Sequence, residues 1–154
     1  MTWVVVDDAA CLRTLDDSAF DGVVCNLSLM DIPDLAGACA AVYRVLRPGG
    51  WFVSSVMHPC FESPHASWLE RDDGSVSRVI HTYHDEGFWR SRNPNGVRGQ
   101  VGAHHRTIST YLNTLIEAGL TVIRICEPRP RPEEPVMVPG YRVVPPVILI
   151  KCRK

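Results

Sequence analysis

Two apolar runs that flank an amphipathic segment constrain the fold of this chain most. Gly22–Leu29 and Trp51–Met57 are apolar along most of their length, as expected for strands of a parallel sheet that is buried on both faces. Between them, apolar residues recur at three- and four-residue steps from Leu35 to Leu46, which is the spacing of one helical face. A strand, a helix and a second strand in such close succession form a βαβ unit, whose handedness makes the two strands parallel. The chain is therefore predicted to be an α/β protein.

Local signals mark where the two expected helices begin and end. Asp31 or Asp34 is predicted to cap the first helix, and Pro48-Gly49-Gly50 is predicted to end it. A second apolar stripe follows Thr107, which is a plausible cap, and stops at Gly119. Both stripes are expected to belong to the core.

The rest of the chain is predicted to supply further strands and two long connections. Trp3–Val6, Leu120–Cys126 and Val147–Ile150 are short apolar runs typical of strands. Pro128–Pro146 holds seven of the twelve prolines, so it should be extended, and the strands on either side of it should pair as an antiparallel hairpin. We expect a sheet of about five strands. Pro59–Gln100 shows no periodicity and is expected to be a long functional loop.

Composition narrows the class of protein. The 154 residues fit a single domain spanning 1–154, and the formal net charge of −1 offers no reason to expect nucleic acid or an anionic membrane as a partner. Met1-Thr2-Trp3-Val4 lacks the basic start of a signal peptide, so a cytoplasmic location is expected. None of the six cysteines shows a CxxC spacing. We interpret them as small buried hydrophobic residues of a reducing compartment, with a disulfide framework or a zinc site as the alternative, and we predict no metal site.

Several motifs together resemble one known family. The most specific of them is the run Tyr43–Gly50, which spans the end of the expected helix and the residues predicted to stop it. The others are Val6-Asp7-Asp8-Ala9, Phe20-Asp21-Gly22-Val23-Val24, Met30–Asp34, His58-Pro59-Cys60-Phe61 and His105–Tyr111. In these residues the chain resembles class I S-adenosylmethionine-dependent methyltransferases of the type 11 group. The resemblance implies a partial Rossmann-like class I methyltransferase sheet, mostly parallel, with a C-terminal antiparallel hairpin strand.

The resemblance covers the family from its third strand onward. Members of the family open with a strand that runs into a glycine-rich loop, and a second strand ends in a ribose-binding acid; the 154 residues contain neither. In the family, the first strand lies beside the strand expected at Gly22–Leu29. We therefore expect Trp3–Val6 to occupy that position or two chains to pair as a homodimer; a separate polypeptide supplying the N-terminal half is the third possibility.

The resemblance also implies residues that bind S-adenosylmethionine as the cofactor. Asp8 and its neighbour Ala9 correspond to the position that accepts a hydrogen bond from the adenine amino group. The resemblance places Asn26 and Leu27 beside the methionine part, and both follow an expected strand at its carboxyl end, where ligands of open α/β sheets bind. The alternatives are a capping aspartate and a turn-forming asparagine.

A second set of residues is expected to face the methyl acceptor. His58 follows the strand Trp51–Met57 and is our candidate for a catalytic base or substrate ligand, with a structural histidine as the alternative. Tyr83, Trp89 and His105 are expected to line the substrate site, unless the aromatic residues only anchor their own loop.

Two functions follow from the sequence. The first is S-adenosylmethionine-dependent methyl transfer to a small molecule, with cofactor binding weakened in the isolated chain because the glycine-rich loop is not among these residues. The alternative is a non-catalytic remnant or subunit that binds a protein partner through an exposed sheet edge.

Overall fold

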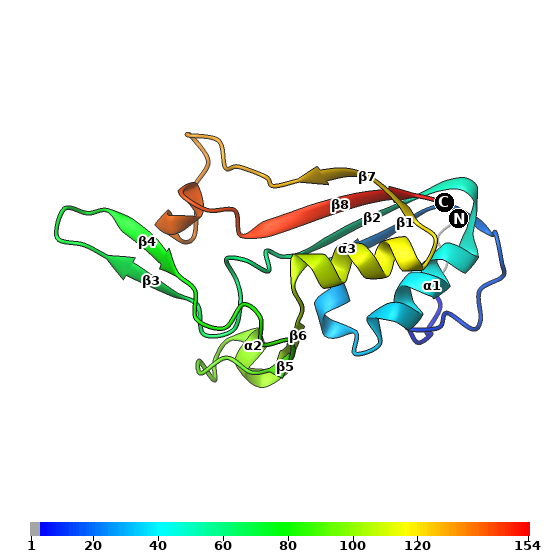
Figure 1. Cartoon of the computed structure of the whole chain (residues 1–154), viewed down its shortest axis with the longest axis horizontal. Helices are drawn as coiled ribbons and strands as arrows, with labels where there is room; N and C mark the ends of the chain where they lie inside the picture. Colours follow the sequence, from blue (N-terminus) through cyan, green and yellow to red (C-terminus); the bar gives the residue numbers. More distant parts are fainter. Residues whose placement is uncertain (1–3) are drawn as a thin grey trace.

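The fold is built on one mixed sheet with helices on one face (Figure 1). The computed structural model describes residues 4–154. The sheet has the strand order β1-β2-β8-β7. Its strands are β1 (Phe20–Asn26), β2 (Leu46–Met57), β7 (Thr121–Cys126) and β8 (Val147–Arg153).

The pairing confirms the βαβ unit and corrects one expectation about the sheet. β1 and β2 are parallel, with Val23 beside Phe52 and Val24 beside Val53. β8 is antiparallel to both β2 and β7. The sheet is therefore mixed, and the expectation of a mostly parallel sheet is wrong. Between β7 and β8 there is a short 3-10 turn but no α-helix that could serve as a crossover, so β8 returns antiparallel to β7 and inserts beside β2.

Helices α1 (Leu35–Val45) and α3 (Ile108–Glu117) cover one face of this sheet (Figure 1). The Asp34 side chain accepts a hydrogen bond from the Gly37 backbone N–H at 2.8 Å, and Thr107 Oγ1 accepts one from the Thr110 N–H at 3.2 Å. Both predicted N-caps are therefore confirmed. The buried core between helices and sheet includes Leu35, Cys39, Val42, Leu46, Phe52, Val56, Tyr111, Leu115, Ile148, Ile150 and Cys152.

The first helix ends earlier than its sequence suggests. α1 stops at Val45, and Leu46 already pairs with Phe20 at the start of β2, so the prediction that Pro48-Gly49-Gly50 ends the helix is wrong. Gly49 N–H donates to the Lys154 carbonyl and Lys154 N–H donates to the Gly50 carbonyl, each at 3.0 Å. The C-terminus thus holds this segment extended through backbone bonds that no local signal reveals.

The segment between β2 and α3 carries regular structure, contrary to the expectation of an irregular loop. It holds two antiparallel pairs, β3 with β4 and β5 with β6. Each element spans only three or four residues, too short for a hydrophobic period to be visible. The elements of this segment are β3 (Ser67–Glu70), β4 (Val76–Val79), β5 (Gly87–Trp89), α2 (Val97–Gln100) and β6 (Ala103–His105). Elsewhere in the chain, two 3-10 turns complete the fold, η1 (Leu29–Asp31) and η2 (Pro139–Arg142).

The N-terminal run does not join the sheet. Trp3 lies outside the described residues, and Val4–Val6 form no strand and are exposed. The expectation that Trp3–Val6 occupies the position beside β1 is therefore wrong for Val4–Val6. Directly after them, the Asp7 side chain bonds both the Thr14 hydroxyl and the Thr14 backbone N–H, which starts a turn instead. Within residues 4–154, β1 pairs with β2 alone.

No helix in residues 4–154 combines the length and the apolar character that crossing a lipid bilayer requires.

Candidate functional site

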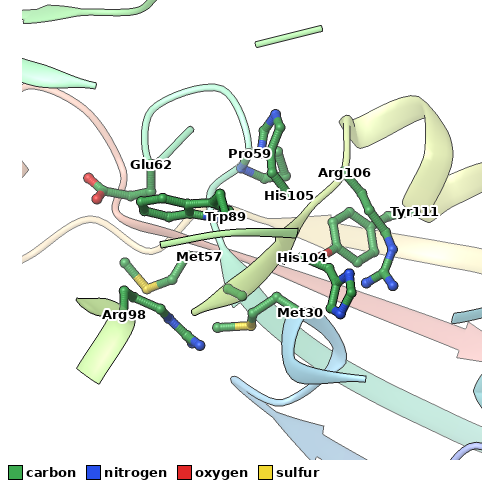
Figure 2. Close-up of a pocket in the computed structure, with 11 residues that line it drawn as sticks. Met30, Met57, Pro59, Glu62, Trp89, Arg98, His104, His105, Arg106 and Tyr111 are labelled. Atoms are coloured by element: carbon green, nitrogen blue, oxygen red, sulfur yellow. The ribbon is translucent and has the colours of Figure 1, made fainter. Parts of the chain in front are cut away.

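A cavity lies where the parallel strands β1 and β2 reach their carboxyl ends (Figure 2). Its volume is about 90 Å³. Met30 from η1 and Met57 from the end of β2 line it together with Trp89 and Tyr111, and Figure 2 shows Met57 beside Trp89 and Arg98. The remaining lining residues are Pro59, Glu62, Arg98, Ala103, His104, His105 and Arg106.

Arg106 holds the loop that follows β1 against this cavity. Its guanidinium is buried and donates hydrogen bonds to the backbone carbonyls of Leu29 at 3.1 Å, Ile32 at 2.7 Å and Pro33 at 2.8 Å. A planar guanidinium can donate in several directions at once, which an ammonium group cannot do with the same fixed geometry. Arg106 thus joins β6 to η1 and positions Met30 in the cavity wall.

The two adjacent histidines of β6 have different environments. His104 packs edge-on against Phe88, with ring centroids 5.4 Å apart. Burial and the nearby Arg106 charge hold the pKa of His104 below its usual value, so its imidazole is neutral at pH 7. The ring of His105 is instead bonded through Nε2 to the Tyr83 carbonyl at 2.8 Å. Of the two, His104 is the one whose ring forms no hydrogen bond within residues 4–154, so it could accept a proton from a bound molecule.

His58 lies behind the cavity rather than in its lining. Its side chain is buried, and Nδ1 accepts a hydrogen bond from the Cys60 backbone N–H at 3.3 Å. The proton is therefore on Nε2, which lies 2.7 Å from Glu127 Oε1. This contact ties the end of β2 to the residue that follows β7. The geometry gives His58 a positioning task, and its predicted role as a base or substrate ligand stays a prediction.

The residues predicted to face the methionine part of the cofactor form a constrained turn after β1. Asn26 Oδ1 accepts a hydrogen bond from Ser55 Oγ at 2.6 Å, and the Leu27 N–H donates to the Ser55 carbonyl at 3.0 Å. Leu27 has a φ of 51°, in the left-handed region that L-residues with side chains rarely adopt. Such strained positions are typical of functional sites, where the surrounding structure enforces them.

Asp8 and Ala9 lie on the exposed turn that precedes β1. Asp8 Oδ1 accepts a hydrogen bond from the Ala10 backbone N–H at 2.9 Å, and the Asp8 carbonyl accepts one from the Leu12 N–H at 2.8 Å. One oxygen of the Asp8 carboxylate, Oδ1, therefore stabilises the turn to which Asp8 belongs. Neither residue lines the cavity of Figure 2.

The structure brings together only part of the predicted substrate set. Trp89 and His105 line the cavity, whereas the Tyr83 hydroxyl accepts a hydrogen bond from the Ile108 N–H at 3.1 Å and lies outside the lining. Sequence reasoning missed Met30, Arg98 and Arg106 as lining residues. Arg106 directly follows His105, which was a predicted substrate residue. This adjacency was the only local sequence signal that Arg106 lies at the site.

Comparisons with known proteins agree on one family. A family model described as a methyltransferase domain matches residues 2–54. The chain is 29% identical to an S-adenosylmethionine-dependent methyltransferase from Mesorhizobium loti, with a TM-score of 0.80 over 96% of this chain and 68% of that one. It is 30% identical to a candidate S-adenosylmethionine-dependent methyltransferase from Listeria monocytogenes, with a TM-score of 0.73 over 91% of this chain and 63% of that one.

A curated relative shows a similar partial coverage. An uncharacterized protein of Haemophilus influenzae is 26% identical over 151 residues, which are 93% of this chain. The chain spans 57% of the length of that relative. Taken together, the family model, the two solved structures and the sheet topology show that this chain is similar to the class I S-adenosylmethionine-dependent methyltransferases.

Proposed function

We propose that this chain takes part in methyl transfer from S-adenosylmethionine to a small molecule, and that the acceptor binds in the cavity of Figure 2. The observation that carries the proposal is the position of that cavity at the carboxyl ends of β1 and β2, where ligands of open α/β sheets bind. The similarity to S-adenosylmethionine-dependent methyltransferases suggests the reaction type.

Methyl transfer from S-adenosylmethionine requires little covalent catalysis by the protein. The cofactor supplies a methyl group that is already activated for transfer. Alignment of reacting groups can contribute roughly 7–11 kcal/mol, so the apolar walls of Met30, Met57 and Trp89 would act by holding the acceptor. His104, with its neutral imidazole, would accept the proton where the acceptor is a hydroxyl or an amine. We propose it for this task because His58 is already bonded to Glu127.

The residues around β1 fit the donor in part. Asp8 Oδ2 has no hydrogen-bond partner in the part of the chain that the structure describes, so it is available to the adenine amino group. The strained backbone at Leu27 provides a turn against which the methionine part would lie. The task proposed for Asp8 and Ala9 is therefore adenine recognition, and that for Asn26 and Leu27 is contact with the methionine part.

Calorimetric titration of the 154-residue chain with S-adenosylhomocysteine tests the donor site. We expect saturable binding, weakened about tenfold by Asp8→Asn because one hydrogen bond to a charged acceptor is lost. Asp16→Asn is the control, since Asp16 is exposed in the same N-terminal segment and should leave binding unchanged. Absence of saturable binding at millimolar ligand, or equal effects of the two substitutions, would reject this donor site.

A second candidate is a non-catalytic subunit that pairs through the edge of β1. It is favoured by Val24, which is 65% exposed, and by the edge of β1 that pairs with no strand in residues 4–154. A second copy of the chain would pair with this edge and cover its unbonded backbone groups. Light scattering would show a dimer that Val24→Lys dissociates. A strictly monomeric chain that also binds S-adenosylhomocysteine would exclude this alternative.

A further inference from the structure

A second, larger cavity adjoins the one in Figure 2. It has a volume of about 390 Å³ and shares Glu62, Trp89 and Arg98 with the first cavity. Small-molecule sites usually measure about 300–1,000 Å³, so the first cavity of about 90 Å³ is too small for most ligands on its own. An acceptor whose reactive atom lies beside Met57 would therefore extend along Trp89 into the second cavity.

The second cavity is positively charged. Three guanidinium groups line it, from Arg78, Arg92 and Arg98, against the single carboxyl group of Glu62. Arg78 Nη2 lies 3.0 Å from Glu62 Oε1, and Arg98 forms an ion pair with Asp31. The charges of Arg78 and Arg98 are thus balanced. Arg92 forms no ion pair or hydrogen bond through its side chain within residues 4–154, so its charge remains available to a ligand.

Two further groups make this cavity suited to an anion. The Ser63 side chain is only 3% exposed, and its hydroxyl has no hydrogen-bond partner in the described part of the chain. A buried hydroxyl left without a partner costs free energy, which a bound oxyanion would recover. Burial also raises the pKa of Glu62, so the one acidic group of the lining opposes an anion less than an exposed carboxylate would.

Figure 2 shows where the acidic residue of the second cavity lies relative to Trp89. The Glu62 carboxylate lies at the far side of Trp89 from Tyr111 and Arg106 and points away from the histidines. The Trp89 indole lines both cavities, so it is a shared wall of the charged second cavity and of the first cavity, which Met30 and Met57 line. A molecule along this wall would place its charged group and its reactive atom at opposite ends.

We propose that the second cavity binds an oxyanion, a carboxylate or a phosphate, carried by the methyl acceptor, with Arg92 and Ser63 as its donors. This inference rests on the proposed function, because it names the class of acceptor for the same site. The acceptor would be a small anionic molecule with a flat or apolar body that packs on Trp89.

Titrations of the 154-residue chain with benzoate and with phenyl phosphate test the proposal, with neutral benzamide as the control ligand. Binding is followed by the NMR signal of the Trp89 indole N–H, assigned through Trp89→Phe. We expect the anions to bind about tenfold more tightly than benzamide, since charge-assisted hydrogen bonds are stronger than neutral ones. The relative affinities of the two anions show which oxyanion the cavity prefers.

Matched variants locate the anion. Arg92→Gln should weaken binding of the preferred anion about tenfold and Ser63→Ala roughly threefold. Arg90→Gln is the control, because Arg90 is exposed, lies near Phe88 and does not line either cavity. Equal binding of benzamide and benzoate, no binding of either anion, or an unchanged affinity in Arg92→Gln would overturn the proposal.

These titrations contain no cofactor, so their outcome is independent of the donor-site titration. Anion binding without S-adenosylhomocysteine binding would leave the cavity assignment standing and remove the methyltransferase proposal for this chain. Cofactor binding without anion binding would leave the methyltransferase proposal standing and remove the assignment of an oxyanion to the second cavity.

Discussion

The two faces of the main sheet differ sharply, and adjacent residues of β2 show it. Phe52 is 0% exposed beneath the helices, whereas Trp51, on the other face, is 40% exposed. Helices α1 and α3 cover the first face, and the second carries no helix in the described structure (Figure 1). Because hydrophobic stabilisation scales with the apolar area removed from water, the helix-covered face should supply most of the stability of the fold.

The uncovered face is packed partly by the strands themselves. The Trp51 ring lies over Gly22 of β1, where a Cβ atom would come within 2.2 Å of the indole. Glycine is thus required at position 22 for the indole to occupy this position. The difference between the faces indicates that the helix-covered side holds the fold together, while the other side keeps apolar surface exposed at Val24 and Trp51.

The largest expected effect separates these faces directly. Phe52→Ala should lower the free energy of unfolding by about 3–5 kcal/mol, because it opens a cavity in the core. Trp51→Ala should cost less than half as much, since much of that side chain is already in water. Urea unfolding followed by circular dichroism measures both values. Equal losses would show that the second face is as well packed as the first.

The second-largest expected effect on stability concerns Arg106, which donates hydrogen bonds to three backbone carbonyls next to the helix-covered face. Arg106→Gln should lower the free energy of unfolding by about 2–3 kcal/mol, because three backbone carbonyls in buried or part-buried hydrogen bonds lose a charged donor. Arg124→Gln, at an exposed position of β7, should change it by less than about 0.5 kcal/mol. The same urea assay compares them, and an unchanged stability in Arg106→Gln would contradict the positioning role.

Cysteine reactivity probes the same contrast without substitutions. Burial raises the pKa of the Cys39 thiol to about 12 and that of Cys152 to about 11, while Cys126 is exposed. At pH 8 the two buried thiols hold almost no thiolate, which is the reactive form. Iodoacetamide labelling followed by mass spectrometry should modify Cys126 first and leave Cys39 and Cys152 unmodified until urea unfolds the chain. Early labelling of Cys39 would mean that the helices leave the sheet readily.

The smallest effect is a pH dependence at the cavity. Burial raises the folded-state pKa of Glu62 above its ordinary value of 4.5. Between the unfolded and folded pKa values the native state binds more protons, so this group contributes stability that is lost as the pH rises through its folded pKa. In Glu62→Gln, the decline in stability from pH 4.5 toward neutral pH should be smaller than in the parent chain. An identical pH profile of the urea midpoint would show that Glu62 does not titrate abnormally.

Local patterns predicted the elements whose stabilising contacts lie close in sequence. The βαβ unit and the caps at Asp34 and Thr107 were predicted correctly, because a helical stripe and a capping side chain act within a few residues. The cysteine interpretation was correct for Cys39 and Cys152, which are buried, and wrong for Cys126. β7 is an edge strand, and its sequence does not reveal that it lacks a neighbour on one side.

The site depended on contacts between distant residues. His58 meets Glu127 across 69 positions, and Arg106 reaches the Leu29 carbonyl across 77. The sequence by itself determined the parallel strand pair, the helices that cover it and the family resemblance, because periodicity and capping are local properties. The tertiary structure alone decided which side chains line the two cavities and which histidine is left free. That arrangement results from packing and hydrogen bonds between segments that have no regular spacing in the chain.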